Sequence, residues 1–186
     1  AAAESAAPEA KDPVVFVHGL MGWGGRDKIN AVMPYWGMTT GSLTSYLNAN
    51  GYETYAASVG PISSAWDRAC ELYAQLVGER TDYGVKHSQD YGHDRFGIDY
   101  EKPLFEGWGT SRAVNLVGHS FGGVTTRLFL EILANGCPEE VEAARAAGVE
   151  PSPFFLGGKG DWVHSLTAIA APHNGTTFIE SNGSIM

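Results

Sequence analysis

Long apolar runs and an excess of basic side chains are missing from this sequence of 186 residues, and it has only two cysteines. No run approaches the roughly 20 apolar residues that a helix needs to cross a bilayer, so we expect no transmembrane segment. Lysine and arginine number 12 against 21 aspartates and glutamates, and the formal net charge is −9. Nucleic acids and anionic membranes repel such a protein at long range, which argues against either as its main electrostatic partner.

Cysteine is limited to Cys70 and Cys137. The two thiols could pair in an oxidising compartment or remain as two free, buried cysteines, and the sequence leaves both readings open. The length fits one domain, and 44% hydrophobic and 18% charged residues are ordinary for a globular chain. Residues 1–12 are small and polar and predict a flexible tail, so we expect the domain to occupy residues 13–186.

A Gly-x-Ser-x-Gly motif, GHSFG at residues 118–122, stands between a valine-rich apolar run and a helical pattern. Strand, sharp turn and helix together are the context of a nucleophile elbow. The serine there sits on a strained turn with little space for side chains two positions away, which Gly118 and Gly122 satisfy. We therefore predict Ser120 as a nucleophile above the first N–H groups of the helix. The alternative is a glycine-rich turn whose serine only caps the helix.

The apolar run VVFV at residues 14–17 predicts a strand buried on both faces, as in a parallel sheet. A glycine-dense loop, HGLMGWGG, follows it directly. In hydrolases with a nucleophile elbow, a loop after an early strand provides one N–H donor for the oxyanion. The backbone N–H of Leu20 is our candidate for this donor. The alternative is a turn that needs flexible residues and nothing more.

Strand and helix patterns alternate along most of the chain. Helices are predicted at residues 41–50, from residue 64 onward, after the elbow and at 139–147, and further strands at 52–58 and 162–171, the last of them buried. This alternation predicts an α/β fold with a mostly parallel sheet flanked by helices. We see no convincing domain boundary along the chain.

Residues 78–103 differ from the rest in being polar, aromatic and rich in glycine, and they contain His87 and His93. On an ideal helix this spacing places the two imidazoles on different sides, so they converge only if the segment folds as a loop. With an upstream aspartate they would provide nitrogen and oxygen ligands of a type that suits zinc. The alternatives are two surface histidines, and an aspartate favoured by the first turn of its helix.

Several motifs, in this order, resemble those of the secreted bacterial lipases of the staphylococcal and thermoalkaliphilic Bacillus type. The resemblance covers nearly the whole chain after Asp12. The motifs are VHGLMG at 17–22, PYWG at 34–37, DRA-x-ELY at 67–73, DYG at 82–84, YGH at 91–93 and APHNG at 171–175. In that family they belong to the oxyanion loop, a tyrosine–tryptophan–glycine turn, a helix, a zinc subdomain and the segment before the lid.

The resemblance implies specific roles for five residues. Structural zinc would be held by Asp67, His87 and His93, with a fourth ligand, an aspartate, beyond residue 186. The oxyanion hole would use the backbone N–H groups of Leu20 and Phe121. Calcium is a further expectation for the complete protein, with its site outside this chain.

The resemblance also implies an α/β-hydrolase fold, with the zinc subdomain inserted at about residues 78–107. The catalytic triad of such enzymes runs from serine to an acid and then to histidine. Only His164 and His173 follow Ser120, and neither matches the family's base. We therefore interpret the chain as the N-terminal half of a lipase, incomplete at its C-terminal side and without the triad acid and histidine.

The function that follows is a secreted carboxylic ester hydrolase, a triacylglycerol lipase or esterase, acting through a serine acyl-enzyme. Its partner would be a lipid or ester substrate, which such an enzyme could meet at a lipid–water interface. Two other hypotheses stay open at this point. One is an inactive fragment that binds zinc or lipid, and the other is an acyltransferase on the same fold.

Overall fold

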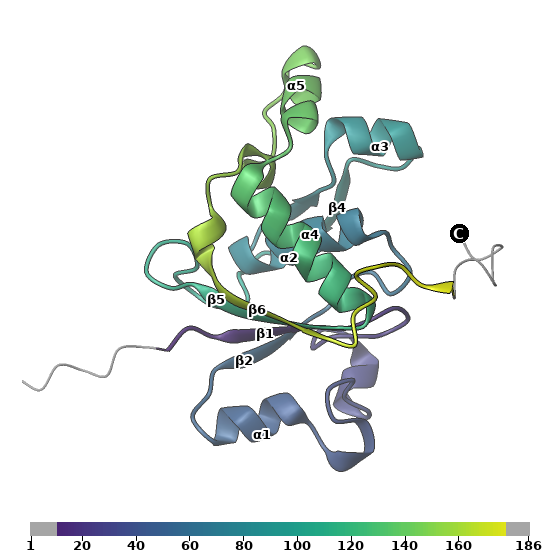
Figure 1. Cartoon of the computed structure of the whole chain (residues 1–186). Helices are drawn as coiled ribbons and strands as arrows, with labels where there is room; N and C mark the ends of the chain where they lie inside the picture. The colour runs from purple at the N-terminus through teal and green to yellow at the C-terminus, as the bar shows by residue number, and fades with distance from the viewer. Residues whose placement is uncertain (1–10, 178–186) are drawn as a thin grey trace, which may run out of the picture.

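The computed structural model describes residues 11–177, and its centre is a four-stranded parallel sheet in the order β2-β1-β5-β6 (Figure 1). Its strands are β1 (Val14–Val17), β2 (Thr54–Ala57), β5 (Val114–His119) and β6 (Val163–Ile169). Each predicted strand is present. Residues 1–10 of the predicted N-terminal tail lie outside the described residues. The predicted mixed α/β fold with a parallel sheet is confirmed.

Helices cover the two faces of this sheet unequally. The α-helices are α1 (Leu43–Ala49), α2 (Ala65–Val77), α3 (Val85–Tyr91), α4 (Phe121–Asn135) and α5 (Pro138–Ala146), with short 3₁₀ helices at Lys28–Ala31, Met38–Thr40, Pro153–Leu156 and Gly160–Trp162. Figure 1 shows α1 on one side of the sheet and α2 and α4 on the other. The predicted helices therefore all occur, with ends shifted by a few residues.

The hydrophobic core lies between the sheet and the α2–α4 layer. Val15, Leu116, Leu72 and Phe129 are all completely buried there. The helical spacing of Leu72 and Leu76 and of Phe129 and Leu133 places apolar side chains on the inner face of each helix. This packing fixes α2 and α4 relative to the ends of β1 and β5.

Strand order places a topological switch point in the middle of the sheet. From β1 the chain continues to β2 on one side, and it then crosses over to β5 on the other. In open parallel sheets, ligands bind outside the carboxyl ends of the strands at such a point. The loop after β1 and the turn after β5 meet there.

The segment predicted as an irregular loop, residues 78–103, contains regular structure. It forms β3 (Arg80–Asp82), α3 and β4 (Phe96–Asp99), with β3 and β4 in an antiparallel pair. The prediction was wrong because these elements span only three to seven residues, too few to show a period. The boundaries proposed for a zinc subdomain, about 78–107, stay a prediction.

Strand β6 occurs where it was predicted, but its predicted burial is wrong for the described residues. Most of its residues are exposed, including Ile169 at 45%. β6 pairs with β5 on one side only and is the edge of the sheet within residues 11–177. An apolar strand with an unpaired edge offers a surface on which a further segment can pack or pair.

Both cysteines are free in the described part of the chain, and Cys70 is buried. Burial raises the pKa of the Cys70 thiol, with nearby carboxylates adding to the effect, so this side chain is unreactive. Among the helices within residues 11–177, none is long and apolar enough to span a bilayer.

Candidate active site and metal-ligand cluster

The turn between β5 and α4 holds Ser120 in a strained backbone conformation. Ser120 has φ 53° and ψ −125°, a region that residues other than glycine rarely adopt. A methyl group on Gly118 would lie 2.5 Å from the carbonyl oxygen of Gly122, and one on Gly122 would lie 2.1 Å from that of Val17. The two glycines are therefore required by close backbone approach, as expected for a nucleophile elbow.

The loop after β1 packs directly against this turn. A methyl group on Gly19 would come within 2.9 Å of the Ser120 Cβ atom. Met21, next to Leu20, has φ 57°, so this loop too contains a non-glycine residue in the left-handed region. The structure thus brings the backbone at Gly19, the residue before Leu20, beside Ser120, which immediately precedes α4.

A side-chain bridge joins the loop to the turn. The Gly19 N–H donates to the Tyr35 hydroxyl at 3.0 Å, and this hydroxyl lies 2.6 Å from Nδ1 of His119. His119 is therefore engaged with Tyr35 and stands immediately before Ser120. The PYWG motif at residues 34–37 thus contributes a contact between the two halves of the site.

His18 supports the same loop from inside the protein. It is completely buried, and its Nε2 accepts a hydrogen bond from the Val59 N–H at 3.3 Å. Its Nδ1 donates to the Gly19 carbonyl at 2.8 Å. Burial lowers the pKa of His18, and the neutral ring with hydrogen on Nδ1 satisfies both contacts.

No hydrogen bond joins Ser120 Oγ to a histidine within residues 11–177. His164 lies near the amino end of β6, whereas Ser120 follows the carboxyl end of β5. Nδ1 of His164 is 3.0 Å from Oδ2 of Asp12. His173 is exposed. The described residues therefore contain the serine turn without a triad base.

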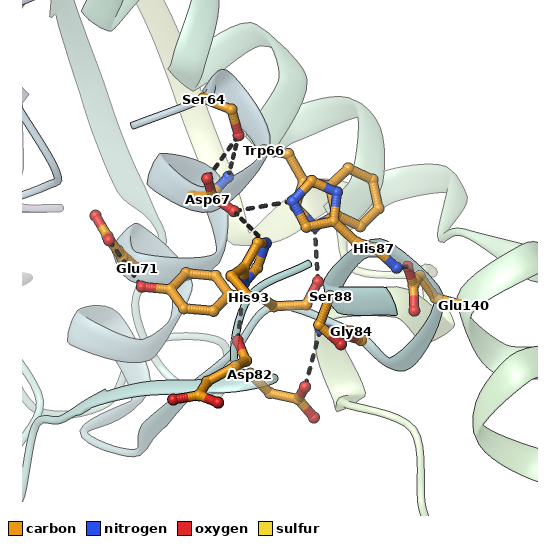
Figure 2. Close-up of polar contacts among 12 residues, drawn as sticks. Ser64, Trp66, Asp67, Glu71, Asp82, Gly84, His87, Ser88, His93 and Glu140 are labelled. Atoms are coloured by element: carbon orange, nitrogen blue, oxygen red, sulfur yellow. Dashed lines mark hydrogen bonds and ion pairs between the residues drawn. The ribbon is translucent and has the colours of Figure 1, made fainter. Parts of the chain in front are cut away.

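A second cluster brings together Asp67, His87 and His93, whose ligand atoms all lie within 4.8 Å of one another (Figure 2). Oδ1 of Asp67 is 2.9 Å from Nε2 of His87 and 3.8 Å from Nε2 of His93. Corners of a zinc tetrahedron are separated by about 3.3 Å when ligand bonds are about 2.0 Å, so this donor set fits the metal. The three side chains predicted to share one metal ion do converge.

Convergence of the histidines arises from a helix end rather than from a loop. His87 lies on α3, and the helix ends at Gly92, which has φ 69° and turns the chain so that His93 points back. Nδ1 of His93 is 2.8 Å from the Asp94 carbonyl, a contact that places the hydrogen on Nδ1 and leaves Nε2 free as a ligand atom. A glycine at the end of a short helix was the signal that helical spacing alone missed.

Helix α2 orients the carboxylate of the cluster. Ser64 caps the helix by accepting from the Asp67 N–H at 3.1 Å, and its hydroxyl donates to Oδ2 of Asp67 at 2.9 Å (Figure 2). The ring of Trp66 stacks on His87, with centroids 5.2 Å apart. The Ser64 contact leaves Oδ1 of Asp67 directed at the histidines, and the Trp66 ring packs against one of them.

Comparison with known proteins identifies the family. Residues 10–185 match the family described as lipase-like, C-terminal domain. The chain belongs to this family. It is 44% identical over 167 residues to a lipase of Staphylococcus epidermidis and 44% identical over 177 residues to lipase 2 of Staphylococcus aureus.

Solved structures give the same result. The Staphylococcus hyicus lipase matches with a TM-score of 0.86 and 42% identity over 95% of this chain. Lipase 1 of Pelosinus fermentans matches with a TM-score of 0.84 and 41% identity over 95% of this chain. The predicted membership of the staphylococcal lipase type is confirmed.

Coverage of the relatives is partial. This lipase-like chain spans about a quarter of the two curated staphylococcal lipases, 24% and 25% of their lengths, and 46% of the S. hyicus chain. The share of 46% means that this chain corresponds to about half of the S. hyicus chain. That it is the N-terminal half stays a prediction.

Sequence reasoning missed two buried charged residues of this lipase-like domain. Arg68 is completely buried beside the loop after β1, and Glu140 is 3% exposed at the start of α3. Arg68 stands four residues before Leu72, on the inner face of α2. A charged residue at an apolar helical position is rarely buried without partners, and this pattern was the available signal.

Proposed function

We propose that this chain provides the nucleophile, the oxyanion hole and the structural metal ligands of a secreted ester hydrolase of the triacylglycerol lipase class. The α/β-hydrolase fold is part of this proposal. The observation that carries it is the strained Ser120 turn between β5 and α4, packed against the loop after β1. The names of the staphylococcal relatives support the choice of substrate class.

Ser120 acts as the nucleophile. Its Oγ bonds to the carbonyl carbon of the ester while its proton passes to a histidine base, which we place outside the described residues. The backbone N–H groups of Leu20 and Phe121 stabilise the negative charge that develops on the carbonyl oxygen. The C–O bond to the alcohol breaks as the alcohol takes up the proton. Water then releases the acid and restores the serine hydroxyl.

Asp67, His87 and His93 would hold a zinc ion, with a fourth ligand from outside this chain. The role is structural, since four protein ligands leave no open position for a substrate. Bound zinc would supply a cross-link between α2 and the α3 segment. The same proposal places the expected calcium site of the complete protein outside this chain.

The partner of the apolar surface formed by Leu20, Met21 and Ile62 is an uncharged lipid or ester. Leu20, Met21 and Ile62 expose apolar side chains at the carboxyl edge of the sheet, at 42%, 72% and 77%. Such side chains suit an apolar acyl chain at a lipid–water interface, and the negative net charge does not oppose a neutral substrate.

The test is hydrolysis of a short-chain ester by the 186-residue chain and by the protein extended to the end of its reading frame. Each form is compared with its Ser120→Ala variant. We expect the extended protein to hydrolyse the ester and to lose at least about 10³-fold in rate with Ser120→Ala. Equal rates for the extended protein and its variant would reject the proposal. Activity confined to transfer of the acyl group to an alcohol would favour an acyltransferase.

A further inference from the structure

Arg68 holds four groups from three different segments, although its side chain is completely buried. Nη2 donates to the His18 carbonyl, and Nη1 donates to the carbonyl of Gly60 at 2.8 Å and more weakly to that of Gly19 at 3.4 Å. Nε donates to the hydroxyl of Thr125 at 3.0 Å. The guanidinium fork is the side chain best suited to several acceptors with fixed directions.

The first contacts determine how the loop after β1 is turned. The Gly19 carbonyl also accepts from Nδ1 of His18 at 2.8 Å and from the Gly22 N–H at 3.2 Å, so its oxygen faces the protein interior. In a trans peptide the C=O and the following N–H point in opposite directions. The N–H of Leu20 therefore points away from Arg68.

The remaining contacts reach the other half of the site. Thr125 lies on the first turns of α4, where its hydroxyl is also 3.0 Å from the Phe121 carbonyl. The Arg68 guanidinium lies over the ring of Phe121, 5.2 Å from its centroid. Arg68 is thus in contact with both segments whose N–H groups are assigned to the oxyanion hole.

A second route from α2 ends at the same loop. Glu71, one turn after Arg68, accepts from the Gly60 N–H at 2.5 Å. The neighbouring Pro61 carbonyl accepts from the Met21 N–H at 2.7 Å. Glu71 therefore holds the N–H of Gly60 and Arg68 holds its carbonyl, and the neighbouring Pro61 carbonyl holds Met21, the residue after Leu20.

We propose that Arg68 is a positioning residue that sets the spacing and direction of the two oxyanion donors, the N–H groups of Leu20 and Phe121. This inference rests on the proposed ester hydrolysis at Ser120. Arg68 does not reach the substrate in this arrangement. It acts by holding the loop after β1 and the first turns of α4 in one geometry.

The first test follows amide hydrogen exchange in Arg68→Lys, with Arg112→Lys as the matched control. Lysine keeps the charge, but its compact ammonium cannot replace a fork that reaches several acceptors. Arg112 is an arginine with a partner of its own, the Glu53 carboxylate, and it lies just before the amino end of β5, away from Ser120. We expect exchange at Met21 and Gly22 to accelerate at least about tenfold in Arg68→Lys while Leu116 in β5 is unchanged.

Two results of this experiment would overturn the proposal. One is unchanged exchange at Met21 and Gly22 in Arg68→Lys. The other is an equal acceleration at Leu116, since this would assign Arg68 to general stability of the core. Arg112→Lys should leave the exchange of the loop amides as in the unaltered chain.

The second test separates kcat from KM for ester hydrolysis by the extended protein. Because the oxyanion forms only in the transition state, we expect Arg68→Lys to lower kcat about 10–100-fold and to change KM less than about twofold. A raised KM at constant kcat would contradict the proposal. If the unaltered extended protein shows no hydrolysis that depends on Ser120, the proposed function fails, and the exchange data alone decide whether Arg68 holds the loop.

Discussion

His18 is a neutral, buried imidazole whose two nitrogens are both bonded. Its pKa is lowered, chiefly by burial, so below about pH 6.5 the unfolded chain binds a proton that the folded chain does not. The free energy of unfolding should therefore fall as the pH drops below that value. Urea unfolding of the unaltered chain and of His18→Asn, at about pH 7.5 and 5.5, measures the pH-dependent contribution of His18 to the free energy of unfolding. An equal pH dependence in both proteins would contradict it.

The metal cluster gives a prediction for single histidines. We expect one zinc per chain by elemental analysis after dialysis, and a loss of most of it in His87→Ala, because three ligands from this chain then become two. His173→Ala is the matched control, since His173 is exposed and lies outside the cluster. Folded, unaltered protein without zinc would reject this assignment.

At the scale of single residues, the sequence predicted much of the site. Ser120 could be found because two glycines, a preceding strand and a following helix all constrain the same turn. Asp67, His87 and His93 could be grouped only by resemblance, since spacing within the chain does not show which side chains meet. Arg68 could not be assigned its partners, because these belong to segments 8 to 57 residues away.

At the scale of elements, helix α3 depends on a carboxylate from another helix. Glu140 of α5 accepts from the backbone N–H of Lys86 at 2.9 Å and of His87 at 2.6 Å, and so it caps the start of α3 (Figure 2). Gly84 has φ 96°, a conformation that favours glycine, and a methyl group there would also lie 2.4 Å from this carboxylate. The cap fixes the backbone that carries a metal-ligand candidate.

Removal of this cap should loosen α3. Glu140→Ala leaves two N–H groups without their acceptor, and we expect a loss of about 1–3 kcal/mol in the free energy of unfolding. We also expect zinc affinity to fall about 10–100-fold, as for other residues that orient metal ligands. Glu139→Ala, at an exposed neighbouring position, is the control and should change neither quantity. Unchanged zinc affinity in Glu140→Ala would contradict the role in positioning His87.

Element lengths explain which parts of the fold the sequence predicted. Helices α2 and α4 span 13 and 15 residues, long enough for their apolar faces to show a helical period. Strand β3 has three residues and α3 has seven, and both are held mainly by contacts with distant segments. Short elements of this kind are stabilised by tertiary contacts rather than by local pattern.

At the scale of the whole molecule, the open edge of the sheet is the main departure from expectation. Strand β6 has the apolar composition of an internal strand, but within residues 11–177 nothing pairs with its outer edge. The sequence predicted the strand from its composition, but its place in the sheet depends on what lies beside it. Exposed, unpaired strand edges favour association between chains.

We therefore expect the 186-residue chain to associate through β6. Sedimentation should show an average mass that rises with protein concentration, and Thr167→Lys should reduce this rise because a charge on an edge strand opposes pairing. Thr110→Lys is the control, because Thr110 lies in an exposed turn before β5. Thr125 would not serve, since it is buried. A monomer at every concentration would contradict this prediction.

The central claim is that Ser120 forms a covalent bond to the acyl carbon of an ester. It is tested most directly by treating the extended protein with an alkylphosphonate ester, which mimics the acyl group and remains bonded to a nucleophilic serine. Mass spectrometry of the digested protein then locates the adduct. We predict one phosphonate, on the peptide that contains Ser120, and none in Ser120→Ala. Hydrolysis that continues with no adduct on Ser120, or with the adduct on another residue, would contradict the account.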